Sequence, residues 1–143
     1  PTFYANSHDV KAVVMNIGAA QDSVNVTWYG STPTGGMLKY GVQGGEMTTL
    51  QAAVAPTSSE GWYKNTVTLT GLQSNTTYEY AVSADKDEAH YGETKTYTTQ
   101  TFGKDEPYTF LVFGAPQIGC SGSIDDDTGG WTNTLNHALA KAP

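Results

Sequence analysis

The sequence predicts a mainly β protein, in which an antiparallel sandwich is followed by an incomplete α/β segment of one strand, one loop and one helix. Before Gly103, short runs alternate polar and apolar side chains, which is typical of strands with one face in a core and one in solvent. At Phe110–Phe113, four consecutive large apolar residues instead indicate a strand covered on both faces, as in a parallel sheet. We therefore expect a sandwich domain over residues 1–104 and the start of a second domain over residues 105–143.

The first three strands follow from period-two alternation. Val10–Ile17 is the first predicted strand, and the next, at Val24–Tyr29, places Trp28 on its buried face. A segment rich in Gly and Pro separates them from a third strand at Leu38–Val42, which contains Tyr40.

The remaining strands complete a set of seven. A Gly-Gly hairpin leads to a predicted edge strand at Glu46–Val54, and a loop separates it from a strand with outward threonines at Thr66–Thr70. The sixth strand is Tyr78–Val82, and the last lies within Tyr91–Phe102, after a charged turn. Seven strands at these spacings predict an immunoglobulin-like sandwich.

Composition excludes several classes of function. The 143 residues carry a net charge of −7, which disfavours nucleic acid as a partner. Cys120 is the single cysteine, so no intrachain disulfide is expected. No apolar run reaches the length of a membrane span. The content of Gly, Tyr and Thr suits a secreted or cell-surface module, and we expect that location.

The segment from Leu69 to Val82 resembles the corner between strands E and F of fibronectin type III domains. In that corner a Leu packs beneath the turn and a Tyr folds its hydroxyl back onto the backbone, and Leu72 and Tyr78 match these positions. With Trp28 and Tyr40, the likeness covers roughly residues 8–102. The resemblance predicts the fold and leaves the function open, because this sandwich has many roles.

The sandwich and the C-terminal segment together resemble the purple acid phosphatases, particularly their bacterial branch. The matching segments are Thr96–Thr99, Tyr108–Gly114, Pro116-Gln117 and Ser123–Trp131. The resemblance implies an N-terminal sandwich followed by a calcineurin-like metallophosphoesterase domain. Only the first metal-binding motif of that family lies within this sequence, so we expect these residues to begin the second domain without completing it.

The resemblance also implies a chemistry. The family hydrolyses phosphate monoesters at a dinuclear metal centre, in which iron is paired with zinc, manganese or iron and the metals activate a bound water. Ala115 stands where the family has a metal-binding Asp, and a methyl group cannot coordinate a metal. Gln117 can offer a carbonyl oxygen from the same loop, which makes a weak ligand. We expect no catalytic residue and no metal cofactor in this chain alone.

Other candidate ligands do not form a recognisable motif. His8, His90 and His137 are far apart, with no HxH or HExxH spacing, so we expect three separate histidines rather than a shared metal site. The run Asp125–Asp127 lacks the alternation of a calcium-binding loop. Capping is the favoured interpretation, in which Asp127 or Thr128 accepts hydrogen bonds from the first amides of the next helix.

The last predicted element is a helix over Thr128–Ala142 with an apolar stripe. The stripe comprises Trp131, Leu135, Ala138, Leu139 and Ala142. This face and Phe110–Phe113 need a cover. We expect it to be either the remainder of the phosphoesterase domain or a second copy of the chain.

Two functions therefore compete. The first is the N-terminal portion of a purple acid phosphatase-like metallophosphoesterase, inactive as this chain alone. The second is a non-catalytic extracellular β-sandwich that serves as a binding or structural module. Exposed aromatic residues are the feature on which a binding face would depend, namely Tyr29, Trp62, Tyr63 and Tyr91. Packing is the favoured interpretation for them, because no polar cluster accompanies them.

Overall fold

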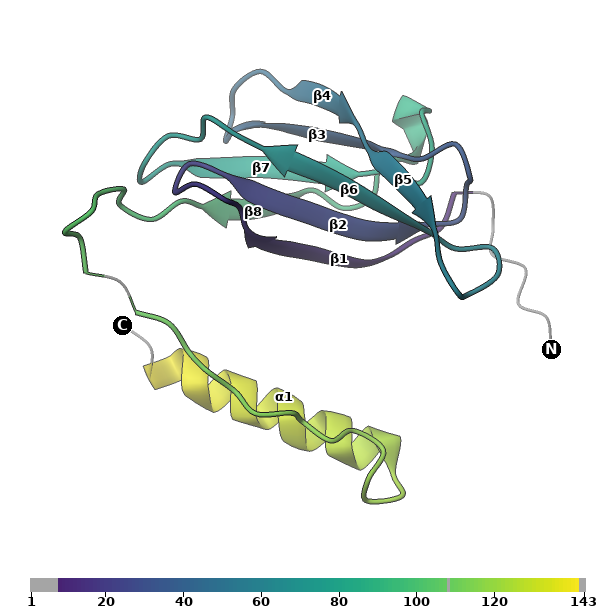
Figure 1. Ribbon diagram of the computed structural model, residues 1–143, viewed down its shortest axis with the longest axis vertical. Coiled ribbons are helices and arrows are strands. Elements are labelled where there is room, and N and C mark those ends of the chain that lie inside the picture. The colour runs from purple at the N-terminus through teal and green to yellow at the C-terminus, as the bar shows by residue number, and fades with distance from the viewer. Residues whose placement is uncertain (1–7, 108, 142–143) are drawn as a thin grey trace. The chain divides into compact units, whose positions relative to one another are not determined.

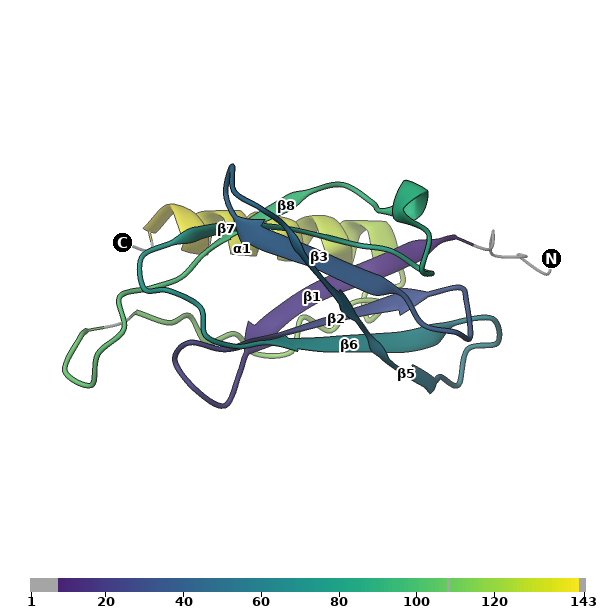
Figure 2. The same cartoon turned by 90° about the horizontal axis from the view of Figure 1, so that it is seen from above.

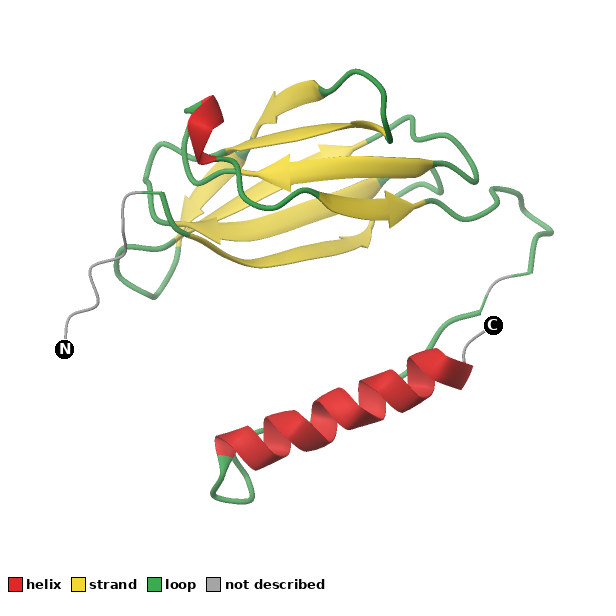
Figure 3. Cartoon of the chain, turned by 180° about the vertical axis from the view of Figure 1, so that it is seen from behind, coloured by secondary structure: helices red, strands yellow, loops and turns green. Residues whose placement is uncertain are grey.

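A computed structural model describes residues 8–107 and 109–141 of the chain. These residues fall into two compact units, which divide between Lys104 and Asp105. The first unit is a β-sandwich and the second contains a helix, and Figure 3 distinguishes them by secondary structure. Each unit is described by itself below.

The first unit consists of two antiparallel sheets of four strands each, which confirms the predicted sandwich (Figure 1). One sheet has the strand order β1-β2-β6-β5 and the other has the order β4-β3-β7-β8. A short 3₁₀ helix, η1, follows β7. The elements are β1 (Val10–Ile17), β2 (Val24–Gly30), β3 (Met37–Val42), β4 (Thr48–Gln51), β5 (Ala53–Pro56), β6 (Tyr63–Leu69), β7 (Thr77–Val82), η1 (Glu88–His90) and β8 (Lys95–Thr98).

The predicted edge strand Glu46–Val54 is wrong in one respect, because the structure divides it between the two sheets. β4 pairs with β3 in one sheet, whereas β5 pairs with β6 in the other. Ala52 lies at the break, is buried, and donates its amide to the Gly36 carbonyl at 3.0 Å. Alternation alone cannot reveal such a change of sheet, because both halves keep the extended backbone of a strand.

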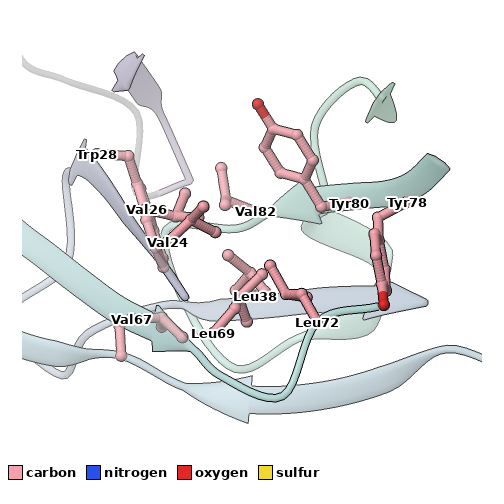
Figure 4. Close-up of a cluster of buried hydrophobic side chains, with 11 residues drawn as sticks. Val24, Val26, Trp28, Leu38, Val67, Leu69, Leu72, Tyr78, Tyr80 and Val82 are labelled. Carbon is pink, nitrogen blue, oxygen red and sulfur yellow. The ribbon is translucent and has the colours of Figure 1, made fainter. Parts of the chain in front are cut away.

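The core lies between the two sheets and is built from the predicted inward-facing positions (Figure 4). Trp28 and Leu38 are fully buried, one from each sheet. The other buried members are Val24, Val26, Ala52, Val67, Leu69, Leu72, Tyr78, Tyr80 and Val82. Tyr40 is half-buried and packs against this cluster. Burial of apolar area on this scale is the main favourable contribution to folding.

Two buried polar contacts join the sheets at one end. The indole Nε1 of Trp28, on β2, donates to the Ser83 carbonyl at 2.9 Å, just beyond β7. The Gly36 amide, just before β3, donates to Oδ1 of Asn65 on β6 at 2.8 Å. Both bonds satisfy polar groups that would be costly to bury alone. They also fix the end of the sandwich from which the β7–β8 connection leaves (Figure 2).

In the second unit, the predicted strand at 110–113 is wrong. The structure has no strand in the described part of residues 105–143, and the side chains of Phe110 and Val112 are 68% and 81% exposed. A strand exists only where a neighbour completes its backbone hydrogen bonds, and neither sheet of the structure includes residues 110–113. The unit's regular element is the helix α1 (Ile124–Lys141). No helix within the described ranges is long and apolar enough to cross a membrane.

Candidate functional site

The loop before α1 holds the residues that the sequence analysis associates with a metal. Ala115 and Gln117 are both exposed, and Gln117 has a φ of +50°, which is unusual for a residue other than glycine. Its carbonyl accepts the Cys120 amide at 3.1 Å, which closes a turn with Gly119 at a φ of +96°. The loop therefore has a defined backbone, with the Gln117 side chain at its surface.

The predicted helix cap at Asp127 or Thr128 is wrong, because α1 begins four residues earlier, at Ile124. Ser123 takes the capping position: its Oγ accepts the Asp126 amide at 3.3 Å. Ser is among the residues most favoured at this position, and the following Asp run then occupies the first turn, where negative charge is stabilised. The shift moves Asp127 inside the helix.

Asp127 instead organises the loop in front of the helix. Its Oδ2 accepts the Gly119 amide at 2.7 Å and the Ser121 amide at 3.3 Å. Hydrogen bonds from the hydroxyl and amide of Ser121, and then from the Gly119 amide, hold the pKa of this carboxyl below its ordinary value. The Asp127 carboxylate thus binds the backbone of the loop through these hydrogen bonds.

The apolar face of α1 was expected to need a cover, and its residues differ in how far they are exposed. Trp131 and Leu135 are half-buried, whereas Leu139 is 64% exposed. Phe113 meets Trp131 edge to face, with ring centroids 5.3 Å apart, so the segment before the helix contacts this face. Much of the face remains accessible.

The corner of the sandwich forms as the resemblance implies. The Gln73 amide donates to the Tyr78 hydroxyl at 2.8 Å, so a buried ring keeps its oxygen satisfied. Leu72 is buried beside it, and its amide donates to the Asp22 carbonyl at 3.0 Å. These contacts stabilise the fold.

A cluster of two histidines and one aspartate lies near the other end of β7. His8 Nδ1 lies 2.5 Å from Oδ2 of Asp85, and His90 Nδ1 lies 2.9 Å from the same oxygen. The two imidazole rings stack with centroids 3.5 Å apart and an interplanar angle of 27°. His8 precedes β1, while Asp85 and His90 lie in the β7–β8 connection that contains η1. We call His8, Asp85 and His90 the histidine–aspartate cluster.

Asp85 is held in place from several directions. Its Oδ1 accepts the Asp87 amide at 2.9 Å, and its own carbonyl accepts the Ser83 hydroxyl at 2.5 Å. Desolvation by burial raises the pKa of the Asp85 carboxyl, but hydrogen bonds from the Asp87 amide, His8 and His90 outweigh it and leave the pKa lowered. Asp85 is therefore an ionised carboxylate in a fixed position.

The expectation of three separate histidines is wrong for two of them. Among residues 8–107 and 109–141, the histidine–aspartate cluster is the one group of three His, Cys, Asp or Glu side chains close enough to hold a metal ion. His137 belongs to the second unit, where its Nδ1 lies 3.0 Å from the Asn133 carbonyl of α1. The sequence contains no local signal for the pairing, because 82 positions separate His8 from His90.

The aromatic residues expected to be exposed are instead half-buried on the sandwich, namely Tyr29, Trp62, Tyr63 and Tyr91. Lys11 Nζ lies 3.6 Å from the centre of the Trp62 ring, and Lys39 Nζ lies 4.3 Å from that of Tyr91. A pocket of about 320 Å³ also lies on this unit, with Lys11 in its lining. Its lining comprises Val10, Lys11, Ala12, Val13, Tyr80, Ala81, Val82, Gly92, Glu93 and Lys95.

The family of the chain follows from comparison with known proteins. A family model described as the purple acid phosphatase N-terminal domain matches residues 10–101, which is more than half of the chain. The chain belongs to this family. The match to the purple acid phosphatase N-terminal domain runs from the first residue of β1 to just beyond β8, so it includes every strand of the sandwich.

A solved structure shows the same fold. The chain is similar to a purple acid phosphatase from yellow lupin (Lupinus luteus) seeds, with a TM-score of 0.54 and 13% identity over 65% of this chain. It spans 20% of the length of that structure. It is also similar to the sensor domain of an anti-sigma factor from Pseudobacteroides cellulosolvens, with a TM-score of 0.46, 16% identity, and coverage of 73% of this chain and 100% of that one. No curated protein matches the sequence.

Proposed function

We propose that this chain is the N-terminal portion of a purple acid phosphatase-like metallophosphoesterase and does not hydrolyse phosphate monoesters by itself. The observation that carries the proposal is the family match over residues 10–101. In this proposal the sandwich is a non-catalytic domain, and the unit after Lys104 is the beginning of the catalytic domain.

The chemistry of the reaction supports the inactivity of these residues alone. Two metal ions, iron with zinc, manganese or iron, would clamp the phosphate and activate water in a complete enzyme. Ala115 offers only a methyl group at the expected ligand position, and Gln117 offers one neutral amide on an exposed loop. Within the described part of residues 105–143, no three His, Cys, Asp or Glu side chains come together.

We propose further that the remainder of a phosphoesterase domain covers residues 110–113 and the face of α1 that carries Trp131, Leu135 and Leu139. The support is the exposure of this apolar surface, which in a catalytic α/β domain would be covered by neighbouring strands and helices. A second copy of the chain is the alternative cover. We place the protein outside the cell or on its surface, in keeping with its composition.

The test compares the 143-residue chain with the full product of the gene that encodes it, each as found and with Ala115→Asp. Hydrolysis of p-nitrophenyl phosphate is measured with iron, zinc and manganese supplied, and bound metal is counted by mass spectrometry. We expect no hydrolysis by the 143-residue chain, and more bound metal in the full product with Ala115→Asp.

Ile118→Asp is the matched control, because it adds a carboxylate to the same loop at a position with no expected ligand role. It should leave the metal content unchanged. Hydrolysis by the 143-residue chain would contradict its proposed inactivity. Equal metal content with and without Ala115→Asp would contradict the ligand position. A full product that binds no metal in either form would favour the binding or structural module instead.

A further inference from the structure

We propose that His8, Asp85 and His90 form a binding site for one divalent transition-metal ion, and that Zn²⁺ fits it best. All three residues lie in the sandwich, so this inference is independent of any phosphoesterase activity in the second unit. Figures 1 and 2 show η1 and the start of β1 at the same end of the sandwich. The site would lie where these two segments meet.

The donor atoms suit such an ion. Imidazole nitrogen and carboxylate oxygen are regular zinc ligands, and two His with one carboxylate form a common set of protein ligands for first-row transition metals. Both Nδ1 atoms are directed at Oδ2 of Asp85, at 2.5 Å from His8 and 2.9 Å from His90. The three donor atoms all lie within 4.8 Å of one another.

A modest movement converts these hydrogen bonds into coordination. With Zn–ligand bonds of about 2.1 Å and tetrahedral angles, neighbouring donor atoms should be about 3.4 Å apart. The distance from His90 Nδ1 to Oδ2 of Asp85 is 2.9 Å and has to lengthen by about 0.5 Å, and the His8 contact by about 0.9 Å. The two rings, which stack with centroids 3.5 Å apart, also have to separate so that both Nδ1 lone pairs can point at one ion.

Metal binding changes which ring nitrogen of His8 and His90 carries the proton. A ring that donates a hydrogen bond to the carboxylate carries a proton on Nδ1. Metal binding requires that each ring carry its proton on Nε2 instead, so that the Nδ1 lone pair is available. Exchange through solvent achieves this change, since the His8 and His90 side chains are 46% and 28% exposed. No oxidant, reductant or covalent step is needed.

The surroundings fix the carboxylate and leave room for water. The Asp87 amide holds Oδ1 of Asp85 at 2.9 Å, which orients the other oxygen toward the two rings. Three protein ligands leave a fourth tetrahedral position for water. An ion bound here would link His8, two residues before β1, to the β7–β8 connection and stabilise the folded sandwich.

The experiment uses the 143-residue chain without any histidine tag, stripped of metal and titrated with ZnCl₂ by isothermal titration calorimetry. We expect saturable binding of one Zn²⁺ per chain and a higher melting temperature in its presence. His8→Gln and His90→Gln should each weaken binding at least about tenfold. Circular dichroism establishes that each variant has folded.

His137→Gln and Cys120→Ser are the matched controls, because they remove potential zinc ligands outside the cluster and should leave binding unchanged. NMR of the histidine ring nitrogens gives a readout that needs no variant. Zn²⁺ should shift the Nδ1 signals of His8 and His90 and leave those of His137 in place. Absence of saturable binding below about 100 µM zinc would overturn the proposal. So would binding that survives in the chain carrying both His8→Gln and His90→Gln.

Discussion

The two units of this chain use apolar residues in opposite ways. In the sandwich, Trp28 and Leu38 have no exposed surface, and each sheet covers one face of the other. In the second unit, α1 has no buried residue, and Phe110 and Val112 remain largely exposed. Apolar sequence therefore becomes a core only where a second layer is present to cover it.

The two units also differ in where their backbone amides and carbonyls find hydrogen-bond partners. Strands need partners distant in the sequence, as β2 needs β6, whereas a helix makes its hydrogen bonds within itself. The second unit accordingly contains a regular helix, and its apolar segment at residues 110–113 is not a strand. We expect substitutions in the first unit to affect the free energy of unfolding much more than matched substitutions in the second.

The largest effect is expected for Trp28→Ala. Loss of a fully buried indole and of its hydrogen bond to Ser83 should lower the free energy of unfolding of the sandwich by about 4 kcal/mol. Trp131→Ala, on α1, should change it by less than about 0.5 kcal/mol. Urea unfolding followed by circular dichroism measures both. Similar losses for the two variants would remove the distinction between the units.

Glycines provide a second matched pair. A Cβ at Gly36 would lie 1.8 Å from the Ser83 carbonyl oxygen, so Gly36→Ala should destabilise the sandwich by about 3 kcal/mol. A Cβ at Gly130 on α1 would meet no atom within 4 Å, and Gly130→Ala should stabilise the helix by about 1 kcal/mol. Melting temperature and helical circular dichroism report the two effects. A destabilising Gly130→Ala would show that this part of α1 is covered.

A smaller effect is expected at the corner of the sandwich. Tyr78→Phe removes the acceptor of the Gln73 amide and should lower the free energy of unfolding by about 1 kcal/mol. Tyr40→Phe removes a hydroxyl from a half-buried ring in β3 and should have less than half of that effect. Chemical denaturation of the two variants is the measurement. Equal losses of unfolding free energy would show that the hydrogen bond from the Gln73 amide to the Tyr78 hydroxyl contributes no additional stability.

The smallest effect concerns the loop before α1 and appears in its pH dependence. The pKa of the Asp127 carboxyl is lowered in the folded chain. Its hydrogen bonds with the Gly119 and Ser121 amides are therefore fully present at any pH above the ordinary pKa of Asp, and they are lost as pH falls through the lowered pKa. Carbon-13 NMR of the carboxyl measures this midpoint. Ser121→Ala should raise it toward the ordinary value, and an unchanged midpoint would contradict the assigned cause.

Much of the fold follows from the sequence because its signals are local. Period-two alternation identifies Val24, Val26 and Trp28 as inward-facing, and all three are buried. The spacing of Leu72 and Tyr78 identifies the corner. Local signals fail at Ala52, where one extended segment passes from one sheet to the other, because alternation is the same on both sides of the break.

The candidate sites were less predictable. The sequence points to the loop of Ala115 and Gln117, whose residues lie together because they are neighbours in the chain. It gives no indication that His8 meets His90, because that contact depends on how β1 and β7 are placed in different sheets. The helix start at Ile124 was missed because Ser123 and the Asp run offer several competing capping residues.

By itself, the sequence determined the sandwich, the residues of its core and the resemblance to purple acid phosphatases, since side-chain periodicity and short motifs are properties of neighbouring residues. The tertiary structure decided which extended segments become strands and which distant side chains meet. Residues 110–113 have the composition of a strand but belong to neither sheet of the structure. His8 and His90 have no motif but share a carboxylate, because folding closes the 82 positions between them.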